Sequence, residues 1–132
     1  MASLPRPETD APSTMMRELK WSPAEKAIAR KAFDRALQAE LAEVIRKAKS
    51  MAGKIEQPAD LWELENYLTK RRTEIDRKYD YRYSVLPSVF ANLIREGRLG
   101  EEDLLGLVED KLRYVRLEAN VRPFAGGKSQ PA

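Results

Sequence analysis

The 132-residue sequence contains no cysteine and no histidine. Their absence excludes thiol nucleophiles, disulfides, imidazole bases and every zinc site built from Cys or His ligands. The six glycines are scattered and form no phosphate-binding loop, and no Asp-rich calcium loop is present. We therefore expect no catalytic residues, no metal and no cofactor.

Long hydrophobic runs are also missing. No apolar stretch approaches the roughly 20 residues needed to span a bilayer, and the polar, proline-containing start lacks the apolar core of a secretion signal. We expect a cytoplasmic protein without membrane contact. With 24 Lys and Arg against 21 Asp and Glu, the net charge of +3 is too small to indicate a particular partner.

The length predicts one domain with a tail at each end. Prolines and glycines among polar residues mark residues 1–20 and 120–132 as disordered tails. Residues 21–119 carry dense helical patterning, and we expect them to form one helical domain for dimerisation and partner binding. We expect an all-α fold with one long N-terminal helix and three shorter helices.

The first helix is expected over residues 22–52. Ser22-Pro23-Ala24-Glu25 is a capping box with proline in the first turn, and Gly53 is a suitable stop. Apolar residues then recur at spacings of four and three, which is typical of a heptad-like seam. The seam consists of Phe33, Leu37, Leu41, Val44, Ala48 and Met51.

The second helix is expected from Asp60, as its cap, to residues 79–83, with Glu63 completing a second box. Its inward side would carry Leu61, Leu64, Leu68, Ile75 and Tyr79. A break near residues 81–84 follows, because Pro87 would disrupt a continuous helix.

Two shorter helices complete the domain. The third is expected over residues 85–96, with Ser84 as its cap and Gly97 as its stop. The last is expected over residues 101–119. Its buried stripe would be Leu104, Val108, Leu112 and Val115.

The length of the first helix predicts a homodimer. Some 30 helical residues extend about 45 Å, whereas a compact domain of 100 residues is roughly 35 Å across. The seam therefore overhangs the rest of the domain, and a second copy is the simplest cover for it. The alternative is that the other helices fold back along it. The expected dimer contacts are Phe33, Leu37, Leu41 and Val44.

A second side of the second helix, here called the Trp62 face, combines one tryptophan with polar groups. At about 100° per residue it contains Trp62, Glu65, Asn66, Thr69, Arg72, Thr73 and Asp76. Indole and guanidinium groups often anchor protein interfaces, so this face is a candidate partner surface. Alternatively, Trp62 fills a gap in the dimer and Arg72 is only solvated. Trp62 can serve as both a partner contact and a dimer contact if the dimer seam borders the docking site.

Two other classes of function fit less well. Residues 70–72 and 77–78, with nearby tyrosines, could form a basic strip for nucleic acid, but three acidic residues interrupt it and leave this a weak second class. The carboxylates of Glu63, Glu65, Glu74 and Asp76 lie on a solvated helix, whereas acid–base catalysis needs a desolvated pocket. An enzyme is not expected.

Several stretches, in order and with hardly a gap, resemble the fluorescence recovery protein family across residues 21–119. They are Trp21-Ser22-Pro23-Ala24-Glu25, Asp60-Leu61-Trp62-Glu63-Leu64, Lys70-Arg71-Arg72-Thr73-Glu74-Ile75-Asp76-Arg77-Lys78-Tyr79-Asp80, Ser84-Val85, Val89-Phe90-Ala91 and Glu96-Gly97. The resemblance implies an all-α subunit that forms an antiparallel helical homodimer through its long N-terminal helices, with Leu61 as a further dimer contact.

The resemblance also implies a function. Such a protein is a non-enzymatic regulator that binds the photoactivated orange carotenoid protein, chiefly its C-terminal domain. It accelerates the return of that protein to the resting orange form and ends photoprotective quenching at the phycobilisome. The partner-binding residues expected on this basis are Trp62, Glu65, Asn66, Arg72, Asp76 and Phe90.

Four positions depart from the family pattern. Glu65 and Asn66 replace a His-Asp pair, Ser88 replaces an aromatic residue, and Tyr114 replaces a lysine. These differences keep a second interpretation open, namely a family-like dimeric adaptor with a different protein client.

Overall fold

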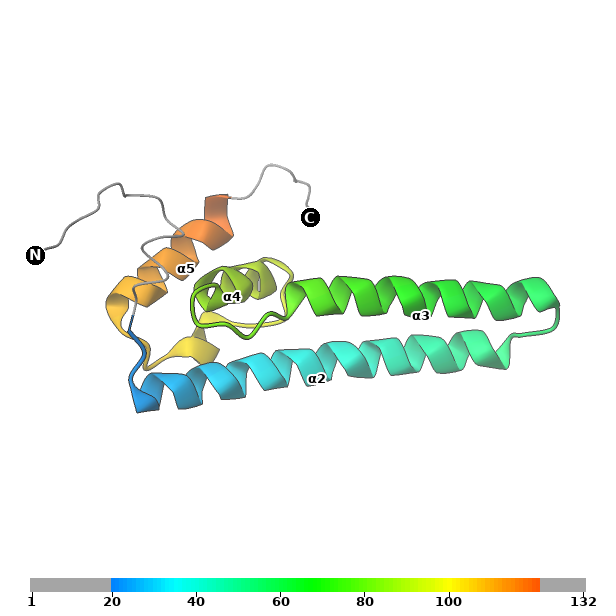
Figure 1. The fold of residues 1–132 in the computed structure, drawn as a ribbon, viewed down its shortest axis with the longest axis horizontal. Coiled ribbons are helices and arrows are strands. Elements are labelled where there is room, and N and C mark those ends of the chain that lie inside the picture. Colours follow the sequence, from blue (N-terminus) through cyan, green and yellow to red (C-terminus); the bar gives the residue numbers. More distant parts are fainter. Residues whose placement is uncertain (1–19, 122–132) are drawn as a thin grey trace, which may run out of the picture.

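The computed structural model describes residues 20–121, which form an all-helical subunit, as expected (Figure 1). The predicted tails lie outside the described residues, except for Lys20 and for residues 120–121, which continue the last helix. The elements are α2 (Pro23–Gly53), α3 (Pro58–Lys78), α4 (Leu86–Arg95), the 3-10 helix η1 (Glu101–Leu104) and α5 (Glu109–Val121).

Within the described range, no helix is long and apolar enough to cross a bilayer. Nor does that range contain a group of three or more His, Cys, Asp or Glu side chains that could hold a metal ion.

Helix α2 begins as predicted. The Ser22 hydroxyl accepts a hydrogen bond from Glu25 N at 3.1 Å, and the Glu25 carboxylate accepts one from Ser22 N at 3.1 Å. The helix has 31 residues, and α3 runs back along it to form a hairpin that extends well beyond the other helices (Figure 1). Of the helices in the fold-back alternative, α3 alone runs along the outer half of α2, where it supplies part of the cover that we assigned to a second copy (Figure 1). The dimer stays a prediction.

The start of α3 differs from the prediction. The helix begins at Pro58 with Gln57 as its N-cap, three residues before the expected cap Asp60. Instead Asp60 Oδ2 accepts hydrogen bonds from the backbone N–H groups of Glu56 at 3.0 Å and Gln57 at 3.1 Å. Proline starts the helix readily because its missing N–H would have no partner there.

Helix α4 forms largely as expected. Its N-cap is Val85 rather than Ser84, and it ends at Arg95, just before the predicted stop Gly97, whose φ is +77°. Arg98 N donates to Leu93 O at 2.9 Å, so the chain turns back and places Leu99 in the core. This is the usual way in which a glycine satisfies the last carbonyl groups of a helix.

The continuous last helix over residues 101–119 is wrong. The chain forms η1, turns at Gly106 (φ +109°) and starts α5 only at Glu109. A residue with positive φ cannot belong to a right-handed helix. The turn lets Leu107 enter the core in place of Val108, which is 50% exposed.

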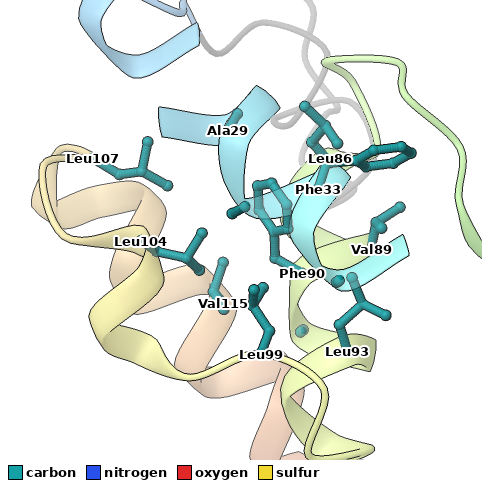
Figure 2. Packing of buried hydrophobic residues seen from close by; sticks show 13 residues of the cluster. Ala29, Phe33, Leu86, Val89, Phe90, Leu93, Leu99, Leu104, Leu107 and Val115 are labelled. Carbon is teal, nitrogen blue, oxygen red and sulfur yellow. The ribbon is translucent and has the colours of Figure 1, made fainter. Parts of the chain in front are cut away.

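The core lies where the first half of α2 meets α4, η1 and α5, which together form the head of the subunit (Figure 2). It contains Ala29, Ala32, Phe33, Ala36, Leu86, Val89, Phe90, Ala91, Leu93, Leu99, Leu104, Leu107 and Val115. Phe33 is only 5% exposed and meets the rings of Tyr79 and Tyr81 edge-on at 5.5 and 4.8 Å. The expectation of Phe33 as a dimer contact is corrected, because its side chain packs inside its own subunit.

Candidate partner-binding surface

The Trp62 face points into solvent along α3. The Trp62 side chain is 59% exposed, and the side chains of Arg72 and Asp76 are 85% and 73% exposed. Arg72 Nε lies 3.8 Å from Asp76 Oδ2, an exposed contact that contributes little to stability. The indole and the guanidinium are thus both accessible to a partner, and Trp62 fills no gap within the subunit.

Five of the six predicted partner contacts belong to this face, since Glu65 and Asn66 are exposed beside the residues just named. The sixth, Phe90, is corrected. It is 0% exposed at the centre of the core and has no surface to offer a partner (Figure 2). The resemblance suggested Phe90 as a partner contact, but it does not show which side of α4 packs into the core.

Apolar side chains remain exposed on the outer half of the hairpin. The predicted inward line of α3 is only partly buried, with Leu61 45% and Leu68 41% exposed, and Ile45 of α2 is 54% exposed. Leu37, Leu41 and Val44 are half-buried. Beyond the head each helix of the hairpin has one neighbour, and a single neighbour covers only one side of a helix. The expected dimer contacts other than Phe33 therefore keep accessible apolar surface.

Sequence reasoning missed a buried carboxylate at Glu40, in the middle of α2. Glu40 is 0% exposed and accepts hydrogen bonds from Arg71 at 2.7 Å, from Lys78 at 2.8 and 3.0 Å and from the Tyr79 hydroxyl at 2.9 Å. Arg98 Nε lies 3.2 Å from it. We call these five residues the Glu40 network.

Burial would by itself raise the pKa of the Glu40 carboxyl. Hydrogen bonds from Lys78, Tyr79 and Arg71 outweigh burial, so the pKa of Glu40 is below its usual value. Burial and the Glu40 carboxylate together raise the pKa of the Tyr79 hydroxyl. The carboxylate therefore stays charged and the hydroxyl stays a donor at neutral pH.

A second buried ion pair joins the start of α2 to α5. Lys111, 2% exposed, places Nζ 3.1 Å from Glu25 Oε1, and Val108 N donates to Glu25 Oε2 at 2.9 Å. Burial by itself raises the pKa of Glu25. The hydrogen bonds from Val108 N and Ser22 N and the Lys111 ammonium lower it by more, so the pKa of Glu25 is below its usual value. The sequence signalled the Glu25 capping box but not its partner on another helix.

The two head positions that depart from the family pattern lie between α4 and α5. The Ser88 hydroxyl donates to Glu118 Oε1 at 2.9 Å, and burial raises the pKa of the Tyr114 hydroxyl beside this pair. The head surface is therefore polar at these positions.

A cleft of about 650 Å³ lies between α3 and α4. Its charged walls are largely paired, with Lys78 2.8 Å from Glu96, Arg98 2.9 Å from Glu96 and Arg71 2.7 Å from Glu74. Such paired charges suit a structural role better than acid–base catalysis, which needs carboxyl groups with separated pKa values.

Comparisons with known proteins agree on one family. Residues 21–119 match the profile described as photoprotection regulator fluorescence recovery protein. The fluorescence recovery protein of Synechocystis sp. is 39% identical over 104 residues, which cover 79% of this chain and 95% of that protein.

Solved structures give the same result. The chain matches the fluorescence recovery protein of Fremyella diplosiphon with a TM-score of 0.74 at 40% identity, over 77% of this chain and 100% of that one. It matches the one from Synechocystis sp. PCC 6803 with a TM-score of 0.73 at 39% identity and the same coverage.

Proposed function

The chain belongs to the fluorescence recovery protein family of photoprotection regulators, and from this we propose that it binds the photoactivated orange carotenoid protein. It accelerates the return of that protein to the resting orange form and so ends photoprotective quenching at the phycobilisome. It acts as a non-enzymatic cytoplasmic scaffold, and it engages chiefly the C-terminal domain of its partner.

The exposed Trp62 face is the observation that carries this proposal. An accessible indole ten residues before an accessible guanidinium, on one side of a helix, supplies the two side-chain types most frequent at interface hot spots. To accelerate the return to the orange form, the protein must bind the transition state between the two conformations more tightly than it binds the activated state. Its preference between the states separately shifts their populations.

The homodimer is part of the proposal. A second copy placed along the outer half of the hairpin would cover Ile45, Leu61 and Leu68, which one chain leaves exposed. Sedimentation should therefore give twice the 15.1 kDa chain mass. Leu68→Glu, an exposed change compatible with a helix, should shift the protein toward the single-chain mass. A wild-type protein that sediments as one folded chain at micromolar concentration would contradict the dimer.

The experiment for the function is to mix the protein with photoactivated carotenoid protein and follow red-to-orange reversion by absorbance. Wild type should accelerate reversion, and Arg72→Ala should weaken the apparent affinity about tenfold, which corresponds to ~1.4 kcal/mol at the interface. Arg113→Ala, an exposed change on α5, is the matched control and should behave as wild type. An unchanged reversion rate with wild-type protein would refute the proposal.

A dimeric adaptor with a different protein client is the second candidate. The departures at Glu65 and Asn66 on the Trp62 face, and at Ser88 and Tyr114 on the head, favour it. Affinity capture with wild type and Arg72→Ala would then recover a client with wild type alone, and reversion of the carotenoid protein would be unaffected.

A further inference from the structure

Helix α3 has little apolar surface to fix its rotation against α2. Of its 21 residues, all of which the structure describes, Ile75 alone is buried. An apolar stripe normally sets which side of a helix faces its neighbour. Here one buried isoleucine, with Leu64 and Tyr67 only half-buried, leaves much of that choice to polar contacts.

The polar contacts that face α2 meet at Glu40. Arg71, Ile75 and Lys78 are spaced four and three residues apart, so they share one side of α3. Arg71 and Lys78 both donate to the Glu40 carboxylate, at 2.7 and 2.8 Å. Their side chains are only 19% and 11% exposed, so water screens these contacts little.

The Trp62 face lies on the opposite side of α3. At about 100° per residue, Trp62, Thr69 and Thr73 are turned roughly half a revolution from Arg71. The Glu40 carboxylate also contacts Arg98, a residue that follows α4 in the chain. Arg98 in turn pairs with Glu43 at 2.8 Å and with Glu96 at 2.9 Å. Glu40 thus connects the rotation of α3 to the head.

Neighbouring residues offer a competing arrangement. Lys70 and Arg77 repeat the pair of cations seven residues apart, one position earlier in the chain. If this pair faced Glu40, α3 would be turned by one residue, Ile75 would leave its buried place and Arg71 and Lys78 would move outward. In the observed rotation, by contrast, Glu40 meets Arg71, Lys78 and the Tyr79 hydroxyl together.

We propose that Glu40 is a positioning residue whose buried carboxylate holds α3 in the rotation that turns the Trp62 face outward and links that face to the head. Its effect on the carotenoid-protein partner rests on the proposed function, whereas its effect on the rotation of α3 does not. Glu40 itself, being 0% exposed, touches no partner.

The rotation can be measured directly because the chain contains no cysteine. Spin labels are placed at exposed positions with Gln38→Cys on α2 and Thr73→Cys on α3. The doubly labelled protein is diluted into unlabelled protein, so that distances between copies do not contribute. We expect one narrow distance distribution in the otherwise wild-type chain, and a second or broadened population with Glu40→Gln.

Glu43→Gln is the matched control. It removes a carboxylate from the same helix that also pairs with Arg98, but its side chain is 48% exposed and, among the described contacts, it does not reach α3. It should leave the distance distribution narrow. Arg71→Met is the second variant, needed if Glu40→Gln fails to fold, and it should also broaden the distribution. A narrow distribution in every folded variant would overturn the proposal.

The partner assay adds a reading that a loss of folded protein would not produce. If one tenth of the molecules keep the correct rotation, the apparent affinity for the photoactivated carotenoid protein falls about tenfold. The reversion rate at saturation stays that of wild type, and circular dichroism shows unchanged helix content. An affinity equal to that of Glu43→Gln contradicts the proposal. Failure of wild type to accelerate reversion would refute the proposed function, while the distances would still test Glu40.

Discussion

Replacing Lys111 with methionine should destabilise the subunit strongly. The change removes the cation of a buried ion pair and leaves the Glu25 carboxylate, 4% exposed, with hydrogen bonds from Ser22 N and Val108 N only. The Lys111 ammonium also donates to Lys20 O and lies 4.8 Å from the Trp21 ring centroid. The variant therefore also loses a link between α5 and the residues that precede α2.

The size of the effect follows from the burial of the pair. Breaking a buried pair by removing one partner costs about 3–5 kcal/mol. For a domain near 100 residues, each kcal/mol lowers the melting temperature by about 4–8 °C. Lys111→Met should therefore melt at least roughly 12 °C below wild type.

Thermal unfolding followed by circular dichroism tests this, at one fixed protein concentration because dimer formation would make the midpoint concentration-dependent. Arg113→Met, two residues along α5, breaks an exposed pair of 3.4 Å and should cost less than about 1 kcal/mol. Equal shifts for the two variants would show that the buried Glu25–Lys111 pair stabilises the fold no more than the exposed pair does.

Two further predictions concern Gly106 and acid. Gly106→Ala should lose about 1–3 kcal/mol of unfolding free energy, because φ is +109° and the new Cβ would lie 2.3 Å from Ile28 Cδ1. The new Cβ of Gly53→Ala would have no atom within 4 Å, so this variant should not destabilise the subunit. Equal losses of unfolding free energy for the two variants in urea titrations would contradict the prediction. Glu25 and Glu40 have lowered pKa values, so their stabilisation is complete above the ordinary value of 4.5 and disappears as pH falls below it. The melting temperature of wild type should fall as the pH drops below about 4.5, and that of Glu25→Gln should fall less steeply. Parallel curves of melting temperature against pH for the two proteins would exclude the Glu25 contribution.

Local signals gave most of the elements. The capping box at Ser22, the proline in the first turn of α4 and the stop at Gly97 each act over three or four residues, and each appears in the structure. Helical periodicity also placed the Trp62 face outward, because charged and amide groups along one side of a helix favour solvent.

The errors share a different origin. The sequence favoured one helix from residue 101 to 119, yet burial of both Leu104 and Leu107 required the turn at Gly106. Phe90 was assigned to a partner by resemblance, but the packing of α2 and α5 around α4 encloses it. Both outcomes depend on which helices meet, which no window of a few residues contains.

The sequence by itself determined the helical class, the family and the outward Trp62 face of α3. Only the tertiary structure decided which residues of α2 and the head meet the opposite side of α3. The contacts responsible join residues far apart in the chain, 31 positions for Arg71 and Glu40 and 86 for Lys111 and Glu25. A capping hydrogen bond is fixed by local backbone geometry. A buried ion pair forms only when the fold has brought both charges together and removed the water between them.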